Sequence, residues 1–302
     1  MTVLEAQDLG KRFGRTWALR ECSLSIPKGC TAALVGPNGA GKTTLINCVV
    51  GLSQPTEGSL RVFGDVAPGS HQALRSIGFV AQDAPLYGHL RVGAMIEVAE
   101  RLNQSFDVSL VQRRLQELGI RSDHRVGSLS GGQHAQLALS LALARGPELL
   151  VLDEPLARLD PLARHQFMAE VMAAVADGGL SVLFSSHVIA ELERVADHLI
   201  VLSHGSVRVA GAVDDLLAGH RILEGPAADI DVVGRHHQVL DVESAGRFAR
   251  LLVRSESPGV ELSNWESAVP SVEELVLAYL KEGEAPASPR AEVPPLQIVK
   301  TP

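Results

Sequence analysis

The chain has 302 residues and a hydrophobic fraction of 46%, enough for one large domain with a sizeable core and a small addition. Its formal net charge of -8 argues against a protein that grips a nucleic-acid backbone, although a small phosphate ligand remains possible. The three cysteines, Cys22, Cys30 and Cys48, fit no metal site and are expected to be free thiols.

No apolar run reaches the roughly 18 residues that a membrane-spanning helix needs. The first residues, M-T-V-L-E-A-Q-D-L, have neither the basic start nor the apolar core of a secretory signal. We therefore predict a cytoplasmic chain that does not cross a membrane. If the chain serves a membrane, a separate protein must span it.

Strands and helices are expected to alternate along most of the chain. Residues 1–35 predict short strands, of which the last is the β-branched, apolar run Thr31–Val35. Further strands are predicted over residues 75–81, 149–152, 181–185 and 199–202, and helices over residues 42–50, 95–102, 110–118, 161–176 and 188–195. This alternation is typical of an α/β fold whose mostly parallel sheet is covered on both faces.

The pattern also divides the chain into parts. Residues 1–220 form the predicted main domain, in which residues 83–145 are a helical insertion. Residues 221–281 predict a small C-terminal α/β subdomain that ends with a short helix near Ser271–Leu280. The stretch 282–302 contains five prolines and little to bury, so it is predicted to be a disordered tail.

A phosphate-binding loop is the first motif that indicates chemistry. The segment G-P-N-G-A-G-K-T follows a predicted strand, opens a helix and matches G-x-x-x-x-G-K-[ST]. The backbone N–H groups and the helix N-terminus can surround a β-phosphate, Lys42 can reach the β- and γ-phosphates, and the Thr43 hydroxyl can bind Mg²⁺. The predicted nucleotide-binding residues here are Gly36, Pro37, Asn38, Gly39, Ala40, Gly41, Lys42, Thr43 and Thr44.

Two carboxylates at the end of a second buried strand complete this site. In E-L-L-V-L-D-E, four apolar residues precede Asp153 and Glu154. Asp153 is placed to hold Mg²⁺ through water, and Glu154 is placed to orient or deprotonate an attacking water. We therefore predict ATP and Mg²⁺ as cofactors.

The segment L-S-G-G-Q, which precedes a helical run, predicts a second anion site. Ser130 is a good N-cap, Gly131 and Gly132 permit close backbone approach, and Gln133 follows them. A chain with two phosphate-binding devices and one nucleotide suggests a head-to-tail dimer. In such a dimer one copy's phosphate loop and the other copy's L-S-G-G-Q would bind the same ATP.

On these motifs the sequence resembles the ABC transporter ATPases, over about residues 2–220. The resemblance implies a P-loop NTPase fold with an antiparallel N-terminal β part and a helical insertion. It also implies that Gln82 in S-I-G-F-V-A-Q senses Mg²⁺ and the membrane partner. By the same resemblance, Asp160 in L-A-R-L-D-P crosses the dimer interface, and His187 in L-F-S-S-H contacts the γ-phosphate and acts in catalysis with Glu154 and Lys42.

The aromatic residue that stacks on adenine in this family precedes the phosphate loop. Phe13 in K-R-F-G occupies the position where Tyr is commonest, and Trp17 is a nearby alternative. Two departures from the family pattern are Arg158, where a small residue is usual, and the pair His134 and Gln136, where basic residues are frequent. Arg158 could perturb the dimer interface. His134 and Gln136, in place of basic residues, could weaken the local positive electrostatic potential.

The resemblance implies an ATPase subunit of a membrane transporter. It would dock at the cytoplasmic face of the membrane, to a separate permease and to a second copy of itself or a homologous subunit. The build is similar to that of drug- and antibiotic-export ATPases of the ABC-2 type. Alternatives are a soluble ABC ATPase of DNA repair or translation, and a regulatory nucleotide-binding module without turnover. The loop 83–90 is predicted to expose Leu86 and Tyr87 for docking to the permease.

Overall fold

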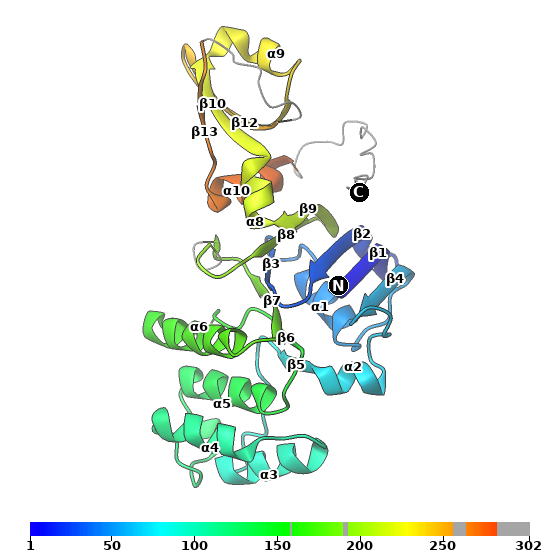
Figure 1. Cartoon of the computed structure of the whole chain (residues 1–302), viewed down its shortest axis with the longest axis vertical. Helices are drawn as coiled ribbons and strands as arrows, with labels where there is room; N and C mark the ends of the chain where they lie inside the picture. Colours follow the sequence, from blue (N-terminus) through cyan, green and yellow to red (C-terminus); the bar gives the residue numbers. More distant parts are fainter. Residues whose placement is uncertain (158, 190–192, 256–263, 283–302) are drawn as a thin grey trace, which may run out of the picture.

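Three β-sheets carry the fold in the computed structural model, which describes residues 1–157, 159–189, 193–255 and 264–282. A six-stranded sheet lies in the middle of Figure 1, with a three-stranded sheet beside it. Helices α3 to α5 lie below the central sheet, α6 lies beside its strand β6, and a four-stranded sheet lies above it. The predicted division into residues 1–220, 221–281 and 282–302 stays a prediction.

The central sheet is mixed and mostly parallel, as predicted. Its strand order is β5-β6-β7-β3-β8-β9, and β9 alone runs antiparallel to its neighbour. Strands β3, β6, β7 and β8 are buried along their whole length, which explains their continuous apolar character. The strands are β3 (Thr31–Val35), β5 (Ile77–Val80), β6 (Leu149–Leu152), β7 (Ser181–Ser186), β8 (His198–Ser203) and β9 (Ser206–Ala212).

The N-terminal sheet is antiparallel, with the order β2-β1-β4. Its strands are β1 (Thr2–Phe13), β2 (Thr16–Pro27) and β4 (Glu57–Val62). Strands β1 and β2 have 12 residues each, so the expectation of short strands was wrong here. The two strands bury one face against helix α1 (Lys42–Val49), which also packs on β3 and β8. This contact ties the antiparallel sheet to the phosphate loop.

A short helix replaces part of one predicted strand. The strand expected over residues 75–81 begins only at Ile77, because helix α2 (His71–Ser76) occupies the residues before it. The Ser70 hydroxyl accepts a hydrogen bond of 3.2 Å from the Ala73 amide and so caps this helix. That local bond favours a helical turn over an extended strand.

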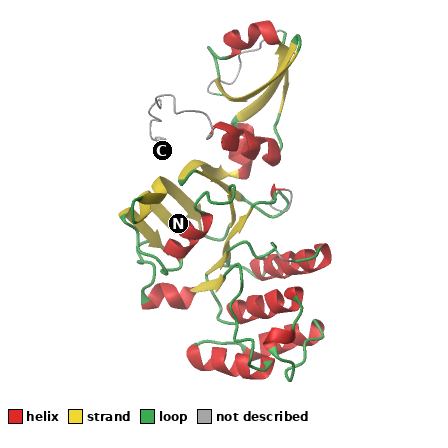
Figure 2. Cartoon of the chain, turned by 180° about the vertical axis from the view of Figure 1, so that it is seen from behind, coloured by secondary structure: helices red, strands yellow, loops and turns green. Residues whose placement is uncertain are grey.

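The helical insertion packs around its own cluster of buried side chains. It contains α3 (Val92–Leu102), α4 (Val108–Glu117), the 3-10 turn η1 (Val126–Ser128) and α5 (Gly131–Leu143). Val92, Val111 and Leu137 are buried at its centre. Helix α6 (Pro161–Ala176) lies next to α5 in both views, and both helices pack against the central sheet, as predicted for a sheet covered by helices (Figures 1 and 2).

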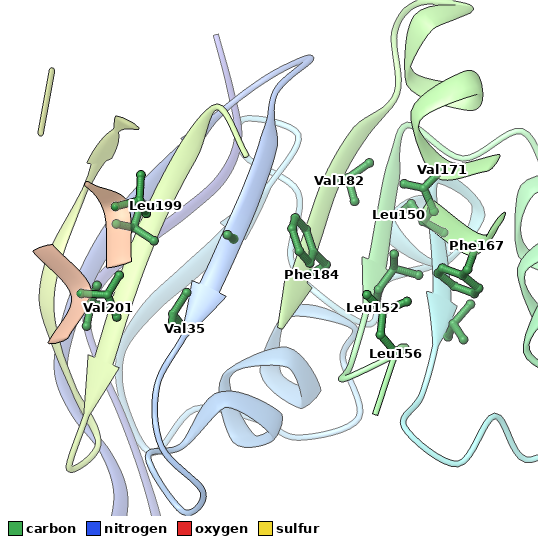
Figure 3. Close-up of a cluster of buried hydrophobic side chains, with 14 of the residues drawn as sticks. Val35, Leu150, Leu152, Leu156, Phe167, Val171, Val182, Phe184, Leu199 and Val201 are labelled. Atoms are coloured by element: carbon green, nitrogen blue, oxygen red, sulfur yellow. The ribbon is translucent and has the colours of Figure 1, made fainter. Parts of the chain in front are cut away.

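The main core lies between the central sheet and α6. Figure 3 shows Phe167 and Val171 of α6 beside Leu150 and Leu152 of β6, with Phe184 of β7 next in the sheet. All five side chains are buried, so this layer holds β6 and β7 rigidly side by side.

Beyond β9 the chain forms a four-stranded antiparallel sheet with the order β11-β12-β10-β13, where the sequence showed only weak signals. Helix α10 contains the predicted helix 271–280 from its second residue onward and packs on both this sheet and β8. The elements are α8 (Val213–Ala218), β10 (His220–Pro226), η2 (Ala227–Asp229), α9 (Ile230–Val233), β11 (Gln238–Ala245), β12 (Phe248–Arg254), β13 (Glu266–Ala268) and α10 (Val272–Glu282).

Two expectations fall on residues that the structure does not describe. The predicted helix 188–195 includes residues 190–192, and nearly all of the predicted tail lies at residues 283–302. Within the described ranges, no helix is both long and apolar enough to span a membrane. The cysteines are free thiols, and burial raises the pKa of Cys30 to about 11.

A buried histidine connects the four-stranded sheet to α10. The Nδ1 atom of His220 lies 2.6 Å from the carbonyl oxygen of Leu216, and its Nε2 atom lies 2.9 Å from the Tyr279 hydroxyl. Burial holds the pKa of His220 below its usual range, which favours the neutral ring. A neutral ring that donates from Nδ1 can accept the Tyr279 proton at Nε2.

Removing this hydroxyl should therefore weaken the fold. We expect Tyr279→Phe to lower the free energy of unfolding by about 1–3 kcal/mol, because the buried Nε2 of His220 loses its partner. Urea unfolding monitored by circular dichroism measures this change. Tyr87→Phe is the matched control, since Tyr87 is 58% exposed and water can replace the lost contact. Equal stability of the two variants would contradict the role given to Tyr279.

Candidate functional site

The carboxyl ends of the parallel strands bring most of the predicted site residues to one edge of the central sheet. Gly36 follows β3, Asp153 follows β6, His187 follows β7 and Gln82 follows β5 by two residues. Ligands of open α/β sheets bind outside this edge, where neighbouring strands send their chains in different directions. The site is therefore a consequence of strand order, which the isolated motifs do not contain.

Two glycines of the phosphate loop are required by their surroundings. A Cβ atom on Gly36 would lie 2.2 Å from the carbonyl oxygen of Leu202 in β8. Gly41 has a φ of +107°, and a Cβ there would lie 2.7 Å from the carbonyl oxygen of Ala18. The loop can therefore turn into α1 only without side chains at these positions.

The N-terminus of α1 is open to an anion. Its N-cap, Gly41, has no side-chain hydrogen bond to the helix, and the first turn contains no acidic residue. By contrast, Ser130 caps α5 and Asp160 caps α6. The first N–H groups of α1 thus lack the side-chain acceptor that such groups need, and phosphate oxygens are suitable acceptors. The loop fits a nucleotide phosphate chain.

Lys42 is held inside this loop. Its side chain is 4% exposed, and its Nζ atom donates to the carbonyl oxygens of Gly36 at 2.8 Å and Pro37 at 3.2 Å. The same Nζ atom lies 3.1 Å from Oε1 of Glu154. A buried ammonium needs such partners, because an unpaired charge in the protein interior is costly.

Glu154 links this lysine to the predicted switch histidine. Its Oε2 atom lies 3.3 Å from Nδ1 of His187, whose side chain is 46% exposed. The backbone of Glu154 is in the left-handed region, with a φ of +44°, which is uncommon for a residue other than glycine. The three predicted catalytic residues therefore lie in one chain of contacts, Lys42–Glu154–His187.

The residues predicted to bind Mg²⁺ lie around the same edge. Asp153 is 2% exposed, and Thr43 and Gln82 are exposed. Neither Thr43 nor Gln82 has a side-chain partner within the described residues, so both remain available to a ligand. Mg²⁺ is ordinarily bound by one or two protein oxygens together with phosphates and water, and Asp153 with Thr43 supplies that donor set. Thr44, which was predicted to bind the nucleotide, is half-buried in α1.

Sequence reasoning missed one residue of the site. The Ser185 hydroxyl donates to Oδ1 of Asp153 at 2.8 Å and accepts from the Glu154 amide at 2.9 Å. Ser185 is fully buried in β7, next to β6 in the sheet. Its position two residues before His187, in S-S-H, was the available signal, but nothing local distinguishes it from Ser186.

The L-S-G-G-Q segment lies apart from the phosphate loop. Ser130 and Gln133 form a capping box at the start of α5, with bonds of 3.1 Å and 3.2 Å. A Cβ on Gly132 would lie 3.0 Å from Cβ of Ala163, so α5 begins close beside α6, where Asp160 accepts from the Ala163 amide at 3.0 Å. Among the described residues, no hydrogen bond or ion pair joins Ser130, Gly131, Gly132, Gln133 or Asp160 to the phosphate loop.

Of the two aromatic candidates for adenine stacking, Phe13 is the more open. It is 57% exposed at the end of β1, with the Lys11 ammonium 5.0 Å from its ring centroid. Trp17 is half-buried against Gly10, and the Arg12 guanidinium lies 5.3 Å from its ring. Phe13 therefore presents more free ring surface.

The departures from the family pattern have different outcomes. Arg158 lies outside the described residues. Gln136 is 3% exposed, so it faces the interior and does not soften the field at the surface as suggested. His134 is half-buried, and burial lowers its pKa.

Leu86, predicted to be exposed for docking to the permease, is less exposed than expected, because it packs against the core clusters of both the insertion and the sheet.

Fold and site together define a P-loop nucleotide-binding protein. A family model described as ABC transporter matches residues 19–157. The chain is 30% identical to the bacitracin transport ATP-binding protein BcrA of Enterococcus faecalis, over 67% of each chain. It is 34% identical to the sulfate/thiosulfate import ATP-binding protein CysA of Escherichia coli, over 70% of this chain and 61% of that one. The chain belongs to the ABC transporter family of ATP-binding proteins.

Solved structures agree with this family. An ATP-binding subunit of an ABC transporter matches with a TM-score of 0.64 at 28% identity, over 72% of this chain and 92% of that one. The cbiO1 protein of Clostridium perfringens, part of the ABC transporter complex cbiONQ, matches with a TM-score of 0.62 at 26% identity, over 72% and 91%. The chain spans about three fifths of the length of the first curated relatives that it matches.

The contact at Gly36 gives a direct test of the loop geometry. We expect Gly36→Ala to abolish nucleotide binding and to lower the free energy of unfolding by about 1–3 kcal/mol, because the new methyl group meets a backbone carbonyl that cannot move aside. Thermal unfolding with and without ATP measures both effects. Gly234→Ala is the control, since its Cβ would meet nothing closer than 3.7 Å. Retention of binding in Gly36→Ala would contradict the close approach.

Proposed function

We propose that this chain binds and hydrolyses ATP as the nucleotide-binding subunit of an ABC transporter. The observation that carries the proposal is the contact chain Lys42–Glu154–His187. It lies at the phosphate loop, where helix α1 begins without a side-chain cap. A regulatory module without turnover would not need a glutamate at this place. Family membership supports the proposal, since the relatives are named as transporter ATP-binding proteins.

ATP would bind with its phosphates in the loop that Gly36 and Lys42 delimit and with its adenine on Phe13. Asp153 and Thr43 would hold Mg²⁺, which supplies positive charge to the β- and γ-phosphate oxygens. Lys42 would move from the Glu154 carboxylate to the phosphates. That exchange replaces one anionic partner by another, so the ammonium stays compensated throughout.

Glu154 would then be free to act on water. As a carboxylate it can accept a proton from the attacking water, and the His187 ring, 3.3 Å away, can orient it and approach the γ-phosphate. The same group that pairs with Lys42 in the structure would thus become the general base once phosphates bind Lys42.

Hydrolysis is proposed to need two chains. Ser130 and Asp160 begin neighbouring helices on the face formed by α5 and α6, without a bond to the phosphate loop of the same chain among the described residues. A second copy, or a homologous subunit, would supply its Ser130 segment to the γ-phosphate held by Lys42. The positive N-terminal end of α5 suits that anion.

The transported compound would pass through a separate membrane-spanning permease, to which this chain docks at the cytoplasmic face. Export of a drug or antibiotic by an ABC-2 type system is the direction we propose. The relative named as a bacitracin transport protein, of which this chain covers 67%, supports an antibiotic as the transported compound, and its name gives no direction. The sulfate relative and the Fe(3+) relative of Pseudomonas fluorescens, 35% identical over 70% of this chain and 62% of that one, are named import proteins. Uptake assays in inverted vesicles with the permease would distinguish the two directions.

A soluble ATPase of DNA repair or translation is the less favoured function. A net charge of -8 disfavours binding to a phosphate backbone, and we expect no nucleic-acid partner. The transporter relatives named above also favour the function of a transporter subunit.

The shared-site proposal predicts the behaviour of Glu154→Gln. The amide cannot take a proton from water, so we expect turnover to fall about 10² to 10⁴-fold while ATP still binds. Blocked hydrolysis should trap a dimer around two ATP molecules. Gel filtration should show that dimer with Mg²⁺-ATP and a monomer with ADP.

Adding Ser130→Arg to that variant should abolish the dimer, because the long side chain would occupy the γ-phosphate contact. A Glu154→Gln chain that stays monomeric at saturating Mg²⁺-ATP would count against sharing of the site. Wild-type turnover in Glu154→Gln would remove Glu154 from catalysis.

Docking to the permease predicts that a surface substitution can abolish permease binding without changing basal ATPase activity. Tyr87 is 58% exposed and follows Gln82 by five residues, whereas Leu86 is packed and unsuitable for substitution. We expect Tyr87→Asp to lose co-purification with the permease while basal ATPase activity stays near wild type. Leu102→Asp is the control, since Leu102 is 78% exposed elsewhere on the insertion. Equal co-purification of both variants with the permease would place the docking surface elsewhere.

A further inference from the structure

Ser185 lies at the one point where β7 contacts both carboxylate-bearing residues at the end of β6. The parallel register pairs Leu152 with Phe184, so the residues that follow, Asp153 and Ser185, lie side by side. The Ser185 hydroxyl donates to Oδ1 of Asp153 at 2.8 Å and accepts from the backbone amide of Glu154 at 2.9 Å. One hydroxyl thus bonds two consecutive residues of a neighbouring strand end.

Two other serines of β7 show what a structural hydroxyl does in this strand. Ser181 accepts from the Gly29 amide at 2.8 Å, and Ser186 accepts from the Val188 amide at 3.0 Å. Both are buried, and each supports a nearby loop. Ser185 differs in that both of its partners belong to the proposed catalytic site.

The Asp153 carboxylate depends on this contact. Asp153 is 2% exposed, and the Ser185 hydroxyl is the hydrogen-bond partner that the described residues provide for its side chain. The bond engages Oδ1 and leaves Oδ2 without a protein partner in the described part of the chain. A carboxylate held by one oxygen keeps the other oriented for a ligand.

The backbone of Glu154 depends on it as well. Its left-handed φ of +44° is a conformation that persists only when the surroundings hold it. The amide of Glu154 points at the Ser185 oxygen, and the carboxylate of the same residue reaches both Lys42 and His187. Loss of the acceptor would leave a partly buried N–H without this partner and free the turn to relax.

We infer that Ser185 is a positioning residue that sets the Mg²⁺-binding carboxylate of Asp153 and the general base Glu154 relative to one another. This inference rests on the proposed ATPase function. Ser185 touches neither nucleotide nor water in this role, because it acts through the side chain of Asp153 and the backbone of Glu154. It is the part of the site that couples metal binding to the placement of the base.

The test compares Ser185→Ala with wild type in the full chain, with ATP and Mg²⁺ as the probes. Loss of a group that supports a metal ligand typically costs about 10–100-fold in metal affinity or activity. We therefore expect the Mg²⁺ concentration for half-maximal ATPase activity to rise about tenfold or more and the turnover to fall about 10–100-fold. ATP affinity in EDTA, measured by a fluorescent nucleotide, should stay within about twofold, since the phosphate loop is untouched.

A readout without turnover uses nucleotide binding alone. In wild type, Mg²⁺ should strengthen ATP binding and raise the melting temperature above that with ATP and EDTA. In Ser185→Ala we expect this Mg²⁺-dependent increment to shrink strongly. Ser185→Thr keeps the hydroxyl and should restore the increment and most of the turnover.

Ser181→Ala is the matched control. It deletes a buried hydroxyl that accepts one backbone amide in the same strand, remote from the carboxylates. We expect it to lower the melting temperature without changing the Mg²⁺ requirement. If Ser185→Ala does not fold, Ser185→Cys, which keeps a weaker donor of similar size, should show the raised Mg²⁺ requirement.

Wild-type Mg²⁺ dependence and turnover in folded Ser185→Ala or Ser185→Cys would overturn the inference, as would identical losses in Ser181→Ala and Ser185→Ala. Failure of the proposed function has a separate signature. In that case the wild-type chain would not hydrolyse ATP, or Lys42→Ala would bind and hydrolyse ATP as wild type does.

Discussion

Parallel pairing of β6, β7 and β3 places three chain segments at one edge of the central sheet, and the site is built from the residues that leave these strands. The register pairs Leu152 with Phe184 and Val35 with Ser186, so the phosphate loop, the Asp153–Glu154 pair and His187 start within two residues of one another along the strand direction. Burial of β6 and β7 under α6 keeps that edge rigid. A slip of one residue in the register of β6 against β7 would turn Ser185 away from Asp153.

Charge compensation governs the interior of this edge. Lys42 has almost no contact with solvent, so its ammonium needs an anion in every state of the protein. In the structure, Glu154 provides it. Under the proposed function the phosphates take over, and the glutamate becomes available at the moment when a base is required. The ion pair therefore compensates the buried ammonium and keeps Glu154 next to the phosphate loop.

Helix N-termini are used in two ways in this fold. Helix α1 begins without a side-chain cap, whereas α5 and α6 begin side by side with Ser130 and Asp160 as caps. Capping satisfies the first N–H groups in the free chain, and it leaves these two helix ends stable at an exposed face. The uncapped N-terminus of α1 suits a ligand bound within one chain. The capped N-termini of α5 and α6 suit an exposed surface that a second chain would contact.

The sequence by itself determined strands β3, β6, β7 and β8 of the central sheet, the phosphate loop and the two carboxylates, but not the order of the strands. These features are local. Apolar runs predict buried strands, and a contiguous motif predicts its own backbone geometry. The predicted helices 42–50 and 161–176, observed as α1 and α6, illustrate this. Tertiary structure alone decided the four-stranded C-terminal sheet, the burial of Leu86 and the role of Ser185. The physical reason is that strand partners and register bring together residues far apart in sequence. A serine hydroxyl can bond its own backbone, a loop or a catalytic carboxylate with the same local sequence around it.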